Sequence, residues 1–432
     1  MSNTTTDQLD PLAEPTVRVS KGFIAVLALT NLGIWTAFFA PIQFLLPLQI
    51  DALEGGGTKE SSLGLVLSVG ALVSLVASPI AGALSDRTTS RLGRRRPWVL
   101  WPSLASFGVL LTLGHLTTLG MLVIGWALAQ LTLNASYAAV TAMLPDQVPV
   151  EQRGTVSAMV GVAQPLGVIL GGAIATFVAG DNTAASGQDL RYLVVAVIVL
   201  LTALLFVFRI KEPKLAKGSM PPLQMGAFLR SFWVSPKEHP DFAWVWLTRF
   251  LVILGTAFVT SYLLYFSIDV LGKSADDAPA TVFSILLFYI LALLVSTVIV
   301  GPMSDRVGKV KPFVIGASII AAIAMVILAF AHTVAVASIA AFVMGVGFGA
   351  YTAVDLALIS RVLPEAGDRA KDLGVINIAN AAPQVLAPFT AGLIVQAFSG
   401  LGYDTAYGIL YVFAAVVTIL GAVLVVKVRS VP

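Results

Sequence analysis

Gly82-Ala-Leu-Ser-Asp86-Arg87 recurs 219 positions later as Gly301-Pro-Met-Ser-Asp305-Arg306. Five further landmarks recur at offsets of 217 to 219: Leu144-Pro145-Asp146 with Leu363-Pro364-Glu365, Pro165 with Pro383, Thr30-Asn31 with Thr248-Arg249, Ile50-Asp51 with Ile268-Asp269, and His115 with His332. One shared dipeptide would be chance, but a nearly constant offset over several landmarks indicates that the chain is a duplication of one unit.

The composition predicts that this unit lies in a membrane. Hydrophobic residues make up 57% of the 432 residues, and Asp, Glu, Lys and Arg make up 11%, against roughly a quarter in soluble domains. The charges separate apolar runs of about 20 residues, the length that crosses a bilayer. This pattern excludes a soluble enzyme, a disordered protein and a nucleic-acid binder. Because the alternating pattern of a membrane barrel is absent, the spans are expected to be α-helices.

Cysteine and histidine usage limits the chemistry further. The chain has no cysteine and three scattered histidines, which excludes disulfides, thiolate sites and a metal centre built on histidine alone. We therefore expect no metal and no cofactor. The first twenty residues are polar and acidic, unlike a secretory signal peptide, so the first span is expected to insert uncleaved.

The apolar runs predict twelve transmembrane helices. They cover residues 22–50, 61–84, 98–115, 118–143, 155–179, 190–208, 241–269, 277–303, 312–331, 333–360, 373–399 and 405–426. If the N-terminus is inside, 22 of the 26 Lys and Arg residues fall in cytoplasmic segments. The positive-inside rule therefore predicts that both termini are cytoplasmic.

A basic, proline-rich segment divides the spans into two sets of six. We expect an N-terminal six-helix bundle over 1–209, a cytoplasmic linker over 210–240 and a C-terminal bundle over 241–432. Within the linker, Met225 to Trp233 is equally compatible with an interfacial helix and with an ordered loop. An even number of spans per unit gives both bundles the same orientation. Parallel repeats of this kind imply a substrate site between the bundles and alternating access by rocking.

The loop after the second span carries a family resemblance. It reads Gly82-Ala-Leu-Ser-Asp86-Arg87-Thr-Thr-Ser-Arg91-Leu-Gly93-Arg94-Arg95-Arg96-Pro97-Trp98 and resembles the signature cytoplasmic loop of the major facilitator superfamily. The chain is similar to that superfamily over its full length. The resemblance implies an all-α membrane protein of two six-helix bundles. In the family this loop latches the bundles through charge pairs, which implies a cytoplasmic gate of Gly82, Asp86, Arg87, Arg94, Gly301, Asp305 and Arg306.

Elementary electrostatics explains why an acidic residue in this loop is accompanied by arginines. Asp86 ends a helix, where the macrodipole is negative, so an arginine is needed to neutralise it. Gly82 and Gly93 permit close approach and a tight turn. Topogenic positive charge at the membrane surface is the alternative explanation, and it accounts for the arginines but not for the Asp-Arg order.

The longer form of the motif narrows the resemblance. It is similar to the loop of glycoside–pentoside–hexuronide:cation symporters and sucrose transporters, and Asn134-Ala-Ser-Tyr137 resembles their Asn-x-Pro-Tyr pattern. Sodium-coupled members carry an Asp where this chain has Ser78 before Pro79. Some members are also acidic at the position of Asn134. The resemblance implies sugar transport, without support for sodium coupling or for coupling through the N-terminal half.

Two ionisable residues lie within the predicted spans, Arg249 in the seventh and Asp355 in the tenth. Such residues cost roughly 2.5–3.5 kcal/mol on insertion scales and are functional candidates. At 1.5 Å per residue both lie at similar depth, so they can pair. We expect Asp355 to take up a proton and Arg249 to tune it or to hold substrate. A static ion pair or a snorkelling arginine is the alternative.

Neutral polar and aromatic residues form stripes on several helices, as expected around a central cavity. With Arg249 they give the predicted substrate-binding set: Asn31, Trp35, Gln130, Asn134, Tyr137, Arg249, Thr256, Tyr351, Asn377, Asn380 and Gln384. Hydrogen bonding between helices is the alternative for each of them, because such bonds are common in membrane bundles.

The sequence thus predicts a secondary active transporter of a small polar solute, a sugar or glycoside, with a proton as coupling ion. It is expected to be a monomer in the plasma membrane, in contact with lipid and without nucleic acid. A proton-coupled exporter of hydrophobic or cationic drugs on the same fold is the first alternative. A receptor or membrane enzyme is the second, and it is disfavoured because no soluble catalytic domain is present.

Overall fold

The computed structural model describes residues 15–54, 58–184, 186–215, 226, 234–362 and 369–429. All regular structure in these ranges is helical. The segment Met225 to Trp233, expected as an interfacial helix or an ordered loop, lies outside the described residues except for Gly226.

The N-terminal half contains the first six predicted spans. They are formed by α1 (Lys21–Ala40) with a π-helical turn (Pro41–Leu45) and α2 (Leu46–Glu54), α3 (Lys59–Asp86), α4 (Arg96–Leu113), α5 (Leu119–Gln147), α6 (Val150–Gly161) with α7 (Ala163–Phe177), and α8 (Asp189–Arg209). The break between α6 and α7 follows from Pro165, whose ring would clash with the carbonyl of Gly161 in a continuous helix.

The C-terminal half contains the other six. They are formed by α10 (Pro240–Ser261) with α11 (Leu263–Asp269), α12 (Ala278–Val307), α13 (Lys311–Ala329), α14 (Val334–Val362), α15 (Arg369–Phe398) and α16 (Tyr403–Leu424). The first span and the seventh span, which are equivalent positions of the repeat, are both interrupted. The helical fold is therefore as expected, and helix ends differ from the predicted ones by a few residues.

Eleven helical segments among the described residues are long and apolar enough to cross a membrane. The predicted span that is not among them is α4, so the expected number of twelve is close but not matched. This helix has only 18 residues. Its mean hydropathy is lowered by Arg96, Pro97 and Pro102. It nevertheless packs along α5 and α8 as a full member of the N-terminal half.

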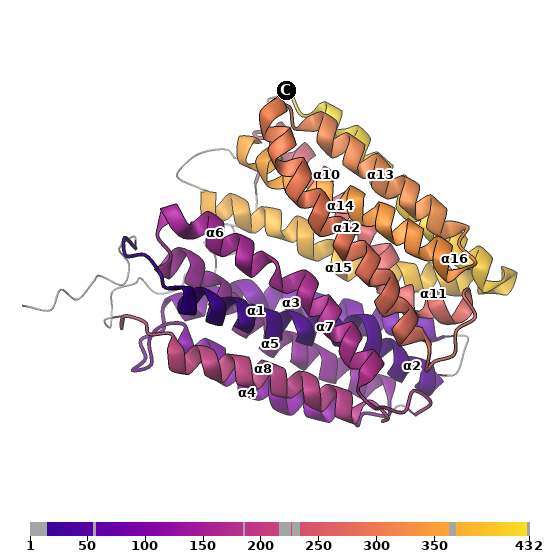
Figure 1. Cartoon of the computed structure of the whole chain (residues 1–432), viewed down its shortest axis with the longest axis horizontal. Helices are drawn as coiled ribbons and strands as arrows, with labels where there is room; N and C mark the ends of the chain where they lie inside the picture. Colours follow the sequence, from indigo (N-terminus) through magenta and orange to yellow (C-terminus); the bar gives the residue numbers. More distant parts are fainter. Residues whose placement is uncertain are drawn as a thin grey trace, which may run out of the picture.

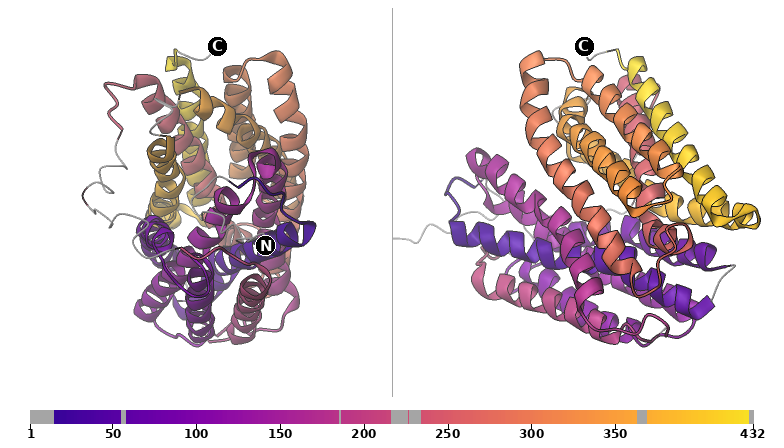
Figure 2. Two further views of the ribbon diagram at one scale, coloured as in Figure 1. Left: turned by 90° about the vertical axis from the view of Figure 1, so that its left-hand side faces the viewer. Right: turned by 45° about the vertical axis from the view of Figure 1, so that its right-hand side comes forward.

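The two halves converge at one end of the molecule and diverge at the other (Figure 1). We call the converging end, where α2 ends, α3 begins and α11 ends, the distal end. We call the opposite one, where α1 begins and α16 ends, the terminal end. The right-hand view in Figure 2 shows the same wedge between the indigo-to-magenta half and the orange-to-yellow half.

Polar contacts between the halves are found at the distal end. The described hydrogen bonds across the halves join Lys59 to Asp269, Tyr262 to the Glu60 carbonyl, Tyr265 to the Pro47 carbonyl, Ser68 to the Val385 carbonyl, and Asn182 to Ala275 and Asp276. In the same region α3 packs along α15, and α7 packs along α12. The molecule is therefore closed at its distal end.

Candidate functional site

A cavity of about 950 Å³ lies between the halves, on the terminal side of these contacts. Its walls come from α1, α3, α5 and α7 of the first half and from α10, α14 and α15 of the second. The lining extends from Leu67 and Pro388, near the distal contacts, to Ile80 and Asp355, nearer the terminal end. Both halves therefore contribute to one central site.

Most of the predicted site residues face this cavity. The lining includes Trp35, Gln130, Asn134, Tyr137, Arg249, Tyr351, Asp355, Asn380 and Gln384. Asn31 and Thr256 are not among the lining residues of this cavity, so their part in binding stays a prediction. Each is buried and donates to a carbonyl one turn earlier in its own helix, Asn31 to Leu27 at 2.9 Å and Thr256 to Val252 at 3.1 Å. The side chain of Asn377 lies outside the described part of the chain.

The two intramembrane charges form an ion pair in the wall of the cavity. A guanidinium nitrogen of Arg249 contacts Asp355 Oδ2. The Tyr351 hydroxyl donates to Asp355 Oδ1 at 2.9 Å, and Arg249 Nε donates to Asn380 Oδ1 at 2.7 Å. The network joins α10, α14 and α15, and its opposite charges balance each other.

The N-terminal half supplies an aromatic wall opposite this network. The indole of Trp35 stacks on Phe39, with ring centroids 5.5 Å apart, and meets Tyr137 edge to face at 5.2 Å. Beside it, Asn134 Nδ2 donates to Gln130 Oε1 at 2.8 Å. Ring faces and amide groups in one wall suit a solute with both C–H and hydroxyl surfaces.

The prediction missed several polar lining residues. Gln164 of α7 is the largest of them, and the signal that could have found it is an amide beside a proline in the middle of an apolar span. Ser78 also lines the cavity. The position where sodium-coupled symporters carry an Asp thus faces the site here, with a hydroxyl in place of a carboxylate.

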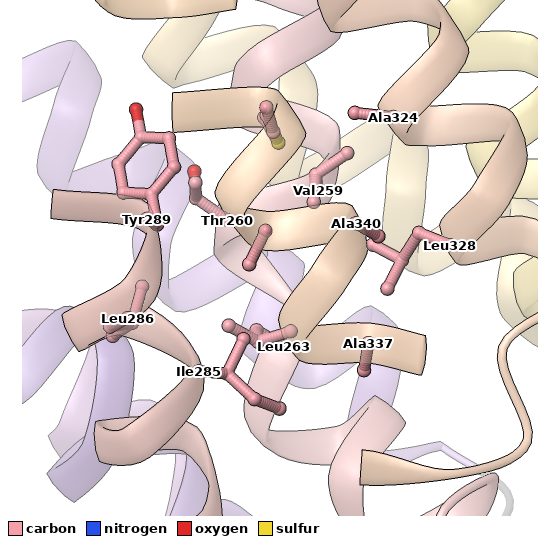
Figure 3. A pocket seen from close by; sticks show the side chains of 12 residues that line it. Val259, Thr260, Leu263, Ile285, Leu286, Tyr289, Ala324, Leu328, Ala337 and Ala340 are labelled. Atoms are coloured by element: carbon pink, nitrogen blue, oxygen red, sulfur yellow. The ribbon is translucent and has the colours of Figure 1, made fainter. Parts of the chain in front are cut away.

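A second cavity, inside the C-terminal half, is lined almost wholly by carbon (Figure 3). Its volume is about 20 Å³, which is the space of roughly one water molecule. Thr260 and Tyr289 lie at its edge among aliphatic side chains from α10 to α14. It is a packing void between helices and too small for a solute.

The loop between α3 and α4 forms a compact charge cluster at the terminal end. Asp86 pairs with Arg95, and Asp146 of α5 pairs with Arg94 at 2.7 Å and with Arg95 Nε at 2.8 Å. Arg95 supplies the arginine that Asp86 was expected to need, and a guanidinium nitrogen of Arg87 donates to the Ala83 carbonyl at 2.8 Å. All these groups belong to the N-terminal half.

A turn at Gly93 makes this cluster possible. Its φ of 108° is left-handed, and a Cβ there would lie 2.7 Å from Glu212 Oε2. Glu212, a residue that the sequence prediction missed, accepts from the Arg95 amide at 2.7 Å. Burial raises the pKa of the Glu212 carboxyl above its ordinary value. The turn thus brings Arg94 and Arg95 back onto the ends of α3 and α5.

The other predicted gate residues are Gly82, Gly301, Asp305 and Arg306. A Cβ on Gly82 would meet nothing within 4 Å, so the close approach expected there is absent. Gly301 is half-buried and Arg306 is exposed, and the Asp305 side chain lies outside the described residues. The described ion pairs at this end, Arg94–Asp146, Arg95–Asp86 and Arg95–Asp146, lie within the N-terminal half. The latch between the bundles therefore stays a prediction.

The molecule is closed at its distal end and holds a central cavity between two six-helix halves, with a buried ion pair in the cavity wall. This arrangement is that of a membrane transporter. A family model described as "MFS/sugar transport protein" matches residues 28–370. The chain belongs to this family of the major facilitator superfamily. The fold expected from the loop motif is confirmed, and the protein is a transporter and not an enzyme.

The chain is similar to individual proteins that include a solute carrier, a permease and an efflux pump. The chain is 33% identical to mouse Solute carrier family 45 member 3 over 97 residues, 22% of this chain and 16% of that protein. It is 25% identical to the General alpha-glucoside permease of Schizosaccharomyces pombe over 37% of this chain and 32% of that one. It is also 24% identical to the Multi-drug resistance efflux pump PmrA homolog of Lactococcus lactis, over 76% and 78%. The chain thus spans well under two thirds of the first two relatives.

Solved transporters share the fold at low sequence identity. The nucleoside transporter NupG aligns with a TM-score of 0.71 at 12% identity, covering 94% of this chain and 98% of that one. A D-xylose-proton symporter aligns with a TM-score of 0.68 at 17% identity, covering 92% and 96%. These similarities establish the architecture and leave the substrate to the chemistry of the cavity.

Proposed function

We propose that the protein moves a neutral sugar or glycoside across the plasma membrane, coupled to a proton, by alternating access. The observation that carries the proposal is the cavity wall in which Arg249, Asp355, Tyr351 and Asn380 form one hydrogen-bonded network. A carboxylate paired with a cation inside the membrane is a group that can exchange a proton when its partner is displaced.

The cavity suits a solute rich in hydroxyl groups. Amides of Gln130, Asn134 and Gln384 line it, and the ring of Trp35 faces the same space. Amides donate to and accept from hydroxyls, and an indole packs on the C–H face of a sugar ring. The α-glucoside permease of S. pombe and the D-xylose-proton symporter are similar to this chain, which supports sugar as the cargo.

Coupling follows from competition for Arg249. While Asp355 is ionised, it holds the guanidinium. Once Asp355 is protonated, Arg249 is released to bind solute oxygens together with Asn380. Binding of the proton and of the sugar then favour each other, as reciprocal linkage requires. With both termini cytoplasmic, the described conformation faces inward, and the distal contacts form the outer gate. A monomer contains the complete site.

The experiment is uptake into proteoliposomes of the purified chain. An inwardly directed proton gradient should drive radiolabelled maltose or sucrose above equilibrium, and a protonophore should abolish the accumulation. Equilibration without accumulation would exclude proton coupling. Absence of any uptake over a panel of neutral mono- and disaccharides would exclude sugar as cargo.

Export of hydrophobic or cationic drugs is a second candidate, favoured by one specific observation. The sequence similarity to the PmrA homolog of L. lactis extends over 76% of the chain, against 37% for the α-glucoside permease, and Phe38, Phe39 and Phe348 line the cavity. Proton-driven loss of a preloaded cationic dye from the same vesicles, without sugar uptake, would establish this alternative.

A further inference from the structure

A cluster of charges at the distal end belongs to neither the cavity nor the loop between α3 and α4. Lys59 Nζ lies 3.0 Å from Asp51 Oδ1 and 2.7 Å from Asp269 Oδ1. The two aspartates are repeat equivalents, 218 positions apart. One lysine therefore joins the same position of both halves, and the side chains of Lys59 and Asp269 are 6% and 7% exposed.

Glu60, the next residue, is fully buried in the same contact. Its exposed fraction is 0%, and neither carboxyl oxygen hydrogen-bonds to another of the described residues. Its backbone carbonyl lies 2.7 Å from the Tyr262 hydroxyl of the other half, and a Cβ on Gly392 of α15 would come within 2.4 Å of that carbonyl. Glu60 is thus sealed by the C-terminal half and loses this cover when the halves separate at this end.

The described groups around Glu60 do not supply a further positive charge to neutralise its carboxylate. Among the described residues, the titratable groups that act on Glu60 come from five places. They are Lys59 of its own helix, Asp51 of α2, Tyr262 between α10 and α11, Tyr265 and Asp269 of α11, and Tyr407 of α16. Tyr265 and Tyr403 place their rings 4.8 and 5.8 Å from Lys59 Nζ. Lys59 is thus already shared by two aspartates. The start of α3 favours a carboxylate, but two negative neighbours and complete burial oppose it.

We propose that Glu60 binds a proton when the distal end closes and releases it to water when that end opens. Closure buries the carboxyl in its neutral form, and opening exposes it, so the O–H bond breaks and the proton passes to solvent. Lys59 holds Asp51 and Asp269 together in the closed state. Acid pH at this end therefore keeps the halves closed, and alkaline pH loosens them. This site is separate from Asp355 and does not depend on what the cavity carries.

The test is a distance measurement across the distal end without substrate. The chain has no cysteine, so spin labels on His115→Cys and His332→Cys report only there; both positions are exposed and repeat-related. Raising the pH from about 5 to about 9 should shift the wild-type distribution to longer distances, with a closed-to-open ratio that falls up to tenfold per pH unit, the limit for one proton. In Glu60→Gln the short distance should persist throughout.

Two further variants keep the result interpretable. Glu60→Asp retains a carboxyl and should retain the pH shift, which guards against a Gln variant that misfolds. Glu54→Gln is the matched control, because Glu54 accepts from Thr58 and Ser62 within its own half, and it should behave as wild type. A pH shift that survives unchanged in folded Glu60→Gln, or a wild type without any shift, would overturn the proposal. Failure of sugar transport would leave this measurement untouched.

Discussion

Asp355 and Arg249 balance each other inside the membrane, and each also has one neutral partner. Removing one charge leaves the other buried without a counter-charge, whereas removing both leaves a neutral pair. We therefore expect Asp355→Asn and Arg249→Gln each to lower the free energy of unfolding by about 3 kcal/mol, and the double variant to lower it by much less. Chemical unfolding in detergent measures this. A double variant as unstable as the sum of the single ones would show that the pair does not interact.

Trp35 is a partly exposed tryptophan in the lining of the cavity. If a sugar ring packs on this indole, Trp35→Ala should weaken binding of a transported disaccharide about tenfold, which corresponds to roughly 1.4 kcal/mol. Calorimetric titration of the purified protein measures the affinity. Leu29→Ala is the control, because Leu29 lies on the same helix with 44% of its surface exposed on the outside of the bundle. Equal affinities for Trp35→Ala and wild type would exclude this role.

Single residues also show where sequence reasoning succeeds. Arg249 and Asp355 could be predicted because a charge within an apolar run is costly and therefore rare. Asn31 and Thr256 were assigned to the site by helical spacing, but each donates to a carbonyl of its own helix. Spacing defines the face on which a residue lies and does not reveal whether its side chain already has a partner.

At the scale of elements, the contact between α3 and α15 closes the distal end. A Cβ on Gly64 would lie 2.6 Å from the Pro388 carbonyl, too close to fit without separation of the helices. Gly64→Ala should therefore weaken the closed state and raise the alkylation rate of a cysteine placed at Ser68 about tenfold. Such overpacking typically costs 1–3 kcal/mol. Gly82→Ala, which meets nothing within 4 Å, is the control. An unchanged rate in Gly64→Ala would show that this contact does not limit opening.

The loop between α3 and α4 shows what local sequence leaves open. Asp86 and Arg94 of the motif belong to a charge cluster within the N-terminal half, while the latch between the halves stays a prediction. The motif indicated that Asp86 needs an arginine but not which one, and Gly93 turns the chain so that Arg95 is the partner. Glu212 joins from 117 residues away. Partners contributed by distant segments cannot be read from the motif itself.

For the whole molecule, the duplication was the most informative feature. A repeat at a constant offset predicted two halves of equal orientation and a site between them, and the cavity lies there. The distal closure was not predictable, because a transporter visits several conformations and one sequence encodes them all. The lysine shared by Asp51 and Asp269 breaks the repeat, since position 277, the equivalent of Lys59, is an aspartate.

Alternating access makes a prediction about both ends together. Labels on His115→Cys and His332→Cys report the distal end, and labels on Arg91→Cys and Lys309→Cys, both exposed, report the terminal end. A transported sugar at acid pH should broaden both distributions, with long distal distances accompanied by short terminal ones. Pulsed electron resonance on the two pairs measures this. Distal and terminal distances that lengthen together would contradict a rocking mechanism.

Comparison of driven uptake with exchange in Asp355→Asn tests the proposed coupling most directly. Proteoliposomes with the variant should still exchange external labelled disaccharide for internal unlabelled disaccharide, because the cavity and its other polar groups remain. They should fail to accumulate the sugar when a proton gradient is imposed, whereas wild type does both. Accumulation by Asp355→Asn to the wild-type level, with the same dependence on the gradient, would show that the proton travels by another residue.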